Sequence, residues 1–292
     1  MMRRKAKDPS VDLYDAVQVG DVDKVKKCLS KGGSVYYRCP TAEGNTALHT
    51  ASRFGHLDIC KILFQNGANE YQKNEKGNTP LHLAAKHNHA DIAALLCNRG
   101  ADLDEENEYN SSPLHLAARA GAIQTTEYLL SKGSDLDLRE SYSGGTPLHG
   151  ACAEGREGVV ALMLKADRLK DLSKVNFFGD TPLMLAAKAG HAATCKLLLM
   201  DRSRKQLFFM LGMANEGGET PFHAVSRKGN MDILTLLLDS MNGRNGFPQG
   251  NKLSKIKQLQ LLDKKTVEDG RTAFHEAAWQ GHSSITSMLA KL

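Results

Sequence analysis

Histidine and cysteine are the residues of this sequence best suited to chemistry, and it contains eleven of the first and six of the second. Neutral imidazoles and thiolates bind zinc, and both groups serve in nucleophilic catalysis. The closest histidine pair, His87 and His89, lies two residues apart. On a helix these two rings would point to different faces, and no third ligand is evident. We therefore predict no metal site and no cofactor.

The cysteines are scattered without a short paired spacing, which favours reduced thiols over a disulfide framework. Cys60 and Cys195 share one position, five residues after a glycine, where we expect them to pack in the core. The sequence lacks Gly-x-Ser-x-Gly, the phosphate loop Gly-x-x-x-x-Gly-Lys-Ser/Thr and His-Glu-x-x-His. We therefore expect no catalytic residue, no small-molecule substrate and no enzyme activity.

Most of the histidines close a four-residue phrase, Thr-Pro-Leu-His or a close variant, that occurs seven times. Successive copies start 33, 33, 34, 35, 39 and 52 residues apart, so the first half keeps a strict period and the second half carries insertions. The first and last residues of the copies are Thr46 and His49, Thr79 and His82, Ser112 and His115, Thr146 and His149, Thr181 and Met184, Thr220 and His223, and Thr272 and His275.

Each repeated unit has the pattern of two short antiparallel helices, as residues 79–101 illustrate. Thr79 can cap the first helix and Pro80 suits its first turn, while Gly100 follows the second helix as a left-handed stop. The polar segment 74–78 is typical of a hairpin turn, called a finger below. In this phrase, period and turn chemistry the sequence strongly resembles the ankyrin-repeat family.

The resemblance covers nearly the whole chain, because residues 11–33 fit a first unit that lacks the opening phrase. It implies an all-α ankyrin-repeat solenoid of about eight helix-turn-helix repeats with hairpin fingers. The last unit stops inside its second helix, either as a tight natural ending or because the chain is a fragment. The repeats are expected at approximately 11–40, 41–73, 74–106, 107–140, 141–175, 176–214, 215–266 with a long insertion at 239–262, and 267–292, after a disordered basic N-terminus at 1–10.

The resemblance also gives the histidines structural roles. Those that close the phrase are expected to hydrogen-bond the motif threonine and the neighbouring repeat. Four others lie in the turn between the two helices, which is a scaffold position of the family, and only His87 falls outside both sets. The four turn histidines are His56, His89, His191 and His282.

In ankyrin proteins a concave groove is formed by the finger tips and by the exposed end of each first helix. At that helix end the leading residue is basic in five of eight units, which predicts an interrupted line of cations for an acidic partner. The alternative is that these charges only keep a solvated helix soluble. The predicted groove residues are Arg53, Phe54, Lys86, His87, Arg119, Lys188, Arg227, Lys228 and Trp279.

Three consecutive fingers carry aromatic residues near the tip: Tyr109, Tyr142, and the pair Phe177 and Phe178. Exposed rings are favoured anchors for a partner because they bury a large area and lose few rotamers. The alternative is that the rings fold back onto a neighbouring finger.

The insertions are expected to be functional or disordered. Within 239–262, a loop rich in glycine and asparagine precedes Lys252–Leu262, which has the composition of a short helix. A lid, a second docking element and a regulatory segment are equally compatible with it. The smaller insertion, Arg202–Leu211, is expected to extend a helix and to bury the rings of Phe208 and Phe209 between repeats.

These features favour a non-catalytic scaffold or adaptor that binds an acidic or extended segment of another protein. The alternative is a targeting module of a larger enzyme, channel or host-directed bacterial effector. A nucleic-acid binder is disfavoured by the modest net charge of +5 and by the acidic run at 102–108. No apolar run is long enough to cross a bilayer, so we expect a cytoplasmic monomer without membrane insertion, with the nucleus or a host cytoplasm as alternatives.

Overall fold

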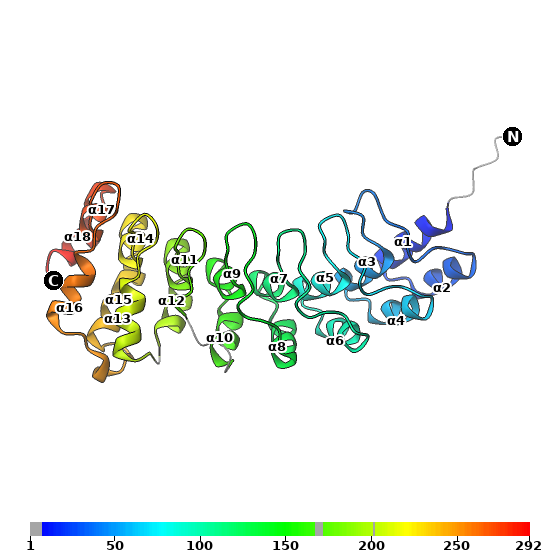
Figure 1. The fold of residues 1–292 in the computed structure, drawn as a ribbon, viewed down its shortest axis with the longest axis horizontal. Coiled ribbons are helices and arrows are strands. Elements are labelled where there is room, and N and C mark those ends of the chain that lie inside the picture. Colours follow the sequence, from blue (N-terminus) through cyan, green and yellow to red (C-terminus); the bar gives the residue numbers. More distant parts are fainter. Residues whose placement is uncertain (1–7, 167–171, 201) are drawn as a thin grey trace. The chain divides into compact units, whose positions relative to one another are not determined.

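The computed structural model describes residues 8–166, 172–200 and 202–292. These residues form eighteen α-helices and one short 3-10 helix, and no extended strand occurs among them (Figure 1). The prediction of an all-α repeat fold is confirmed. Most of the N-terminus expected to be disordered lies outside the described residues. Its last part differs from the expectation, because Asp8 caps a helix that begins at Pro9.

The chain divides into two compact units, and unit 1 comprises residues up to 142. Its helices form consecutive pairs, each consisting of a first helix beside the fingers and a second helix away from them (Figure 1). The pairs are α1 (Pro9–Val19) with α2 (Val22–Ser30), α3 (Ala47–Phe54) with α4 (Leu57–Gln65), α5 (Pro80–Lys86) with α6 (Ala90–Asn98), and α7 (Pro113–Ala120) with α8 (Ile123–Lys132).

Unit 2 comprises residues 143–292 and repeats the same pairing, with additional elements in both insertions. The pairs are α9 (Pro147–Ala153) with α10 (Glu157–Lys165), α11 (Pro182–Ala189) with α12 (Ala192–Leu199), α14 (Pro221–Lys228) with α15 (Met231–Asn242), and α17 (Ala273–Trp279) with α18 (Ser283–Leu289). The additional elements are α13 (Arg204–Gly212), the 3-10 helix η1 (Gln249–Asn251) and α16 (Lys255–Leu262).

The insertions depart from the expectations in two ways. The segment expected to extend a helix forms a separate one, α13, and the ring of Phe209 is 56 % exposed rather than buried. The insertion expected from residue 239 begins later, since α15 continues to Asn242 and buries Ser240 and Met241. The short helix expected within Lys252–Leu262 is present as α16.

The core of unit 1 lies where the first helices pack in series, α1 on α3, α3 on α5 and α5 on α7. The leucine of each phrase, Leu48, Leu81 and Leu114, is fully buried there. Alanines such as Ala84 and Ala117 are also fully buried, and their small side chains allow the helices to approach closely. In unit 2, α9, α11, α14 and α17 pack in the same order.

The repeated phrase caps the N-terminus of the first helix, and in several repeats its histidine also ties that helix to the next repeat. In α5, the Thr79 N–H donates to Nδ1 of His82 at 3.1 Å, and Nε2 of His82 lies 3.0 Å from the Ser111 carbonyl oxygen. A carbonyl only accepts, so Nε2 carries the proton and the ring is a neutral imidazole whose Nδ1 accepts. His49 makes the equivalent contact with the carbonyl of Asn78 at 2.9 Å, and His223 with that of Arg271 at 3.0 Å.

The turn histidines pack on glycines of the preceding repeat. Gly55 has a φ of 80°, and a Cβ added there would lie 2.6 Å from the ring of His89. Nε2 of the same ring lies 3.1 Å from the Arg53 carbonyl oxygen, so the ring is held in place. The turn therefore requires glycine for two reasons, the left-handed backbone and the close approach of an imidazole.

Gly281 offers a matched comparison for Gly55, since its φ is 76° but nothing in the described part of the chain lies within 4 Å of an added Cβ. We expect Gly281→Ala to lower the free energy of unfolding by about 1 kcal/mol, the cost of left-handed backbone for an L-residue. Gly55→Ala should cost roughly twice as much, because the His89 ring must also move. Urea unfolding followed by circular dichroism measures both; equal losses would show that the ring contact contributes nothing.

Candidate functional site

The fingers and first helices of unit 1 enclose a hollow of about 420 Å³. Six of the predicted partner-binding residues line it, and they come from α3, α5 and α7 and from the two fingers that follow α6 and α8. The six are Arg53, Lys86, His87, Tyr109, Arg119 and Tyr142.

Of the four cations that line the hollow, Arg53, Lys86 and Arg119 lie in the last turn of their helices, where positive charge complements the helix dipole. The fourth, Lys76, is paired with Glu43. Arg119 forms an ion pair with the buried carboxylate of Glu140 at 2.6 Å. In contrast, neither Arg53 nor Lys86 pairs with a carboxylate of the described residues. Two uncompensated cations therefore face the hollow.

His87 follows α5 directly and stands beside these two cations. Partial burial lowers the pKa of His87, and the neighbouring charges of Arg53 and Lys86 lower it further. The ring is therefore neutral at pH 7 and offers both a hydrogen-bond donor and an acceptor to a ligand in the hollow.

The fingers that form the other wall are joined to one another through their backbones. The Glu108 N–H donates to the Lys76 carbonyl at 3.1 Å, and the Ser141 N–H donates to the Tyr109 carbonyl at 2.8 Å. These bonds fix the fingers in a row, while the Tyr142 ring at its end remains 84 % exposed. The Tyr142 ring is therefore not folded back onto a neighbouring finger and is accessible from solvent.

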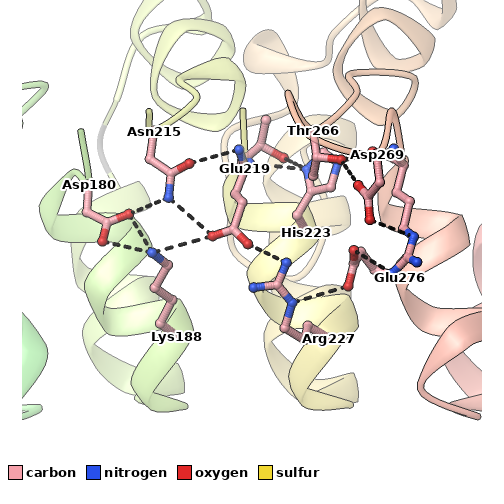
Figure 2. A network of polar contacts seen from close by, with 11 residues as sticks. Asp180, Lys188, Asn215, Glu219, His223, Arg227, Thr266, Asp269 and Glu276 are labelled. Carbon is pink, nitrogen blue, oxygen red and sulfur yellow. Dashed lines mark hydrogen bonds and ion pairs between the residues drawn. The ribbon is translucent and has the colours of Figure 1, made fainter. Parts of the chain in front are cut away.

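The corresponding cations of unit 2 are neutralised by carboxylates of the same unit (Figure 2). Lys188 contacts Asp180 at 2.6 Å and Glu219 at 3.5 Å. Arg227 pairs with Glu219 and, at 3.2 Å, with Glu276. Burial alone would raise the pKa of Glu219, but Arg227, Asn215 and Lys188 outweigh it and hold that pKa below its usual value.

The same network reaches the only tryptophan of the chain. Arg271 contacts Glu276 at 3.8 Å and Asp269 at 2.8 Å, and its guanidinium lies 4.4 Å from the centre of the Trp279 ring. Trp279 is 71 % exposed, so one face of the ring is covered by a cation and the rest is open. Lys228 is also exposed, and it forms no ion pair with a carboxylate of the described residues.

The remaining predicted rings are exposed but differ in their surroundings. Phe54 lies beside Arg53, whose guanidinium is 5.5 Å from the ring centre. The Phe177 ring lies directly against Gly144 of the neighbouring finger, so it is folded back as the alternative interpretation described. Phe178 remains half-exposed at the same finger.

Sequence reasoning missed the carboxylates that neutralise the cations. Asp180 and Glu219 immediately precede the threonine of a phrase, whereas unit 1 has Asn45, Asn78 and Ser111 at that position. This change from amide or hydroxyl to carboxylate was the available signal. Because this residue lies at the base of a finger, its charge meets the cation at the end of the first helix.

The buried thiols are poorly suited to nucleophilic chemistry. Burial raises the pKa of Cys60 and of Cys195 to about 12, so both stay protonated at neutral pH. Within residues 8–166, 172–200 and 202–292, no three side chains of His, Cys, Asp or Glu are grouped as a metal site. Over the same described residues, every helix is too short or too polar to cross a membrane.

The family model for ankyrin repeats (3 copies) matches residues 13–107, 100–174 and 166–246. The chain therefore belongs to the ankyrin-repeat family, whose repeats mediate protein–protein interaction. Fold, capping phrase and finger row agree with this assignment.

Several curated proteins share part of the chain. It is 30 % identical over 155 residues to the E3 ubiquitin-protein ligase XBAT33 of Arabidopsis thaliana, covering 50 % of this chain and 29 % of the relative. It is 31 % identical over 150 residues to the transient receptor potential cation channel subfamily A member 1 of Homo sapiens, and this match covers 50 % of this chain and 11 % of the relative. With NF-kappa-B inhibitor alpha of Sus scrofa it shares 32 % identity over 93 residues, covering 32 % and 29 %. The chain thus spans less than a third of each relative's length.

Proposed function

We propose that this chain is a non-catalytic scaffold or adaptor, and that the hollow of unit 1 binds an extended acidic segment of a partner protein. The observation that carries the proposal is the contrast between the units. At one position of the repeat, Arg53 and Lys86 face the hollow without a carboxylate, whereas Lys188 and Arg227 are neutralised. At this repeat position, cations without a carboxylate partner among the described residues therefore occur in unit 1 and not in unit 2.

The form of the hollow supports an extended ligand. Its lining spans three successive repeats, from Arg53 through Lys86 to Arg119, and the fingers form a fixed wall along it. Tyr109 and Tyr142 add two accessible rings on that wall. A segment with acidic residues and intervening apolar side chains would pair with the cations and pack against the rings.

A targeting module within a larger protein is the second candidate, favoured by the short share of each relative that the chain matches. The names of these three relatives, a ligase, a channel and an inhibitor, indicate different activities. What they share with this chain is the matched stretch of repeats, which fits a module that can belong to proteins of different activity. For either candidate we propose a cytoplasmic, monomeric chain without enzyme activity or a small-molecule substrate.

A selection from a random peptide display library tests the proposal and requires no identified partner. We expect the wild-type chain to enrich peptides rich in Asp and Glu, with faster association at low salt. The double variant Arg53→Glu/Lys86→Glu should slow association with these peptides about tenfold or more, because two attractive charges become repulsive.

The matched control is Lys26→Glu/Lys27→Glu, which makes the same charge change on exposed residues of α2, away from the hollow. It should leave association within about twofold of the wild type. Selection of peptides without excess acid, or equal slowing by both double variants, would contradict the proposed site.

A further inference from the structure

The two inserted helices of unit 2 form a second charged surface, on the side of the repeats away from the fingers (Figure 1). Neither α13 nor α16 belongs to a repeat pair. The two intervals between phrases that contain them are 39 and 52 residues long, compared with 33 in the first repeats. Stacking alone does not require them. Their exposed faces therefore call for an explanation of their own.

Three contacts place α13 alongside the segment that contains α16. The Arg204 guanidinium donates to the Gly250 carbonyl at 2.7 Å, the Lys257 ammonium lies 5.2 Å from the centre of the Phe208 ring, and Lys264 donates to the Gly212 carbonyl. Residue numbers rise together along both segments, so the helices run side by side in the same direction.

Each of these helices buries one stripe and exposes the other. α13 buries Leu207, Met210 and Leu211, and α16 buries Leu261. On the opposite faces large apolar side chains stand in solvent: Phe209 is 56 % exposed and Ile256 is 70 % exposed, with Leu259 exposed beside it. Phe209 and Ile256 are the more exposed of the three, and Leu259 also lines a hollow of about 270 Å³ with residues of α17 and α18.

Cations lie close in the sequence to the exposed apolar side chains of both helices. Within 202–212 and 252–265 the sequence has a single acidic residue, Asp263. None of the exposed lysines here, nor Arg204, forms an ion pair with a carboxylate of the described chain, unlike the paired cations shown in Figure 2. The exposed cations are Arg204, Lys205, Lys252, Lys255, Lys257, Lys264 and Lys265.

We propose that this surface, formed by α13 and α16, docks on an anionic lipid surface. Cations in this number attract acidic headgroups, and exposed apolar side chains enter the boundary between headgroups and acyl chains. A protein partner would need a matching socket for the Ile256 side chain, whereas a lipid layer accepts it without one. The binding is peripheral, and the surface shares no residue with the hollow of unit 1.

Sedimentation of the full chain with vesicles tests this proposal. We expect binding to phosphatidylcholine vesicles that contain phosphatidylserine, a strong loss in high salt, and little binding to phosphatidylcholine alone. Lys255→Gln/Lys257→Gln should weaken binding roughly thirtyfold, since each lysine near an acidic surface contributes a factor of about five. Ile256→Ser should weaken it roughly tenfold through the loss of apolar burial.

Two controls separate this surface from the rest of the chain. Lys26→Gln/Lys27→Gln removes the same charge from α2 and should leave vesicle binding unchanged, as should Arg53→Glu/Lys86→Glu in the hollow. Circular dichroism of each variant checks that the fold persists.

The proposal is overturned if the wild type does not bind the acidic vesicles, or if the α2 variant loses as much vesicle binding as the α16 variant. A wild type that binds polyglutamate but not vesicles, through Lys255 and Lys257, would identify a protein-docking surface and also overturn it. Because the peptide selection reports on unit 1, either proposal can fail while the other holds.

Discussion

Unit 1 is expected to lose about 3 kcal/mol of its free energy of unfolding between pH 6.5 and pH 5, through proton uptake by His49 and His82 in the unfolded chain. Both rings are fully buried, and burial lowers the pKa of each from 6.5 to about 4, helped by the charges of Arg38 and Lys73. Between pH 6.5 and 5 the two rings therefore stay neutral in the folded protein, while the same rings in the unfolded chain bind protons from about pH 6.5 downward. Stability is present above that value and is lost as the pH falls toward about 4.

Urea unfolding at a series of pH values measures this loss, and hydrogen exchange assigns it to unit 1. His82→Gln should be less stable at pH 7.5 but have a shallower acid slope, by up to about 1.4 kcal/mol per pH unit. His87→Gln replaces an exposed ring and should keep most of the slope. A wild-type curve that is flat between pH 6.5 and 5 would show that the phrase histidines are not held neutral.

These histidines show how much of the fold could be predicted from the sequence. The phrase, its period and the glycines after the helices are local features, so the helix pairs and the fingers followed from them. The contact from His82 to the Ser111 carbonyl repeats with the phrase, and was implied by the family resemblance.

The insertions were less predictable because they follow no period. Phe208 and Phe209 are adjacent and equally apolar, and no local pattern distinguishes one from the other. In α13 the inward stripe is taken by Leu207, Met210 and Leu211, which leaves Phe209 on the outer face. Which stripe faces inward depends on α15 and α16, and that packing is decided by tertiary contacts.

For a similar reason, only part of the candidate site could be predicted from the sequence. The cations at the ends of the first helices are in register, so their positions could be predicted. Some of their partners come from other repeats: Glu276 lies 49 residues from Arg227 in the sequence, and Glu219, a partner of Lys188, lies on the finger of the next repeat. Equivalent positions therefore have different electrostatic surroundings, and a column of like charges in a sequence does not define a binding line.

The network of unit 2 gives the other large expected effect. Arg227→Met removes the cation between Glu219 and Glu276 but keeps an apolar stem of similar length (Figure 2). Glu276 is 3 % exposed, so its charge would remain buried with only the longer contact to Arg271 at 3.8 Å. We expect unit 2 to lose about 3 kcal/mol of its free energy of unfolding, the lower end for a broken buried ion pair because Arg227 itself is partly exposed.

The next residue, Lys228, is the matched control. It is exposed in the same helical turn and forms no ion pair with a carboxylate of the described residues, so Lys228→Met should change stability by less than about 0.5 kcal/mol. The triple variant Arg227→Met/Glu219→Gln/Glu276→Gln removes the unpaired charges and should recover more than half of the loss. Urea unfolding with hydrogen exchange in unit 2 measures all three. If Arg227→Met and Lys228→Met lowered the free energy of unfolding equally, the ion-pair network would contribute nothing to the stability of unit 2. The pairing of the cations with carboxylates in this unit would then need an explanation other than stability.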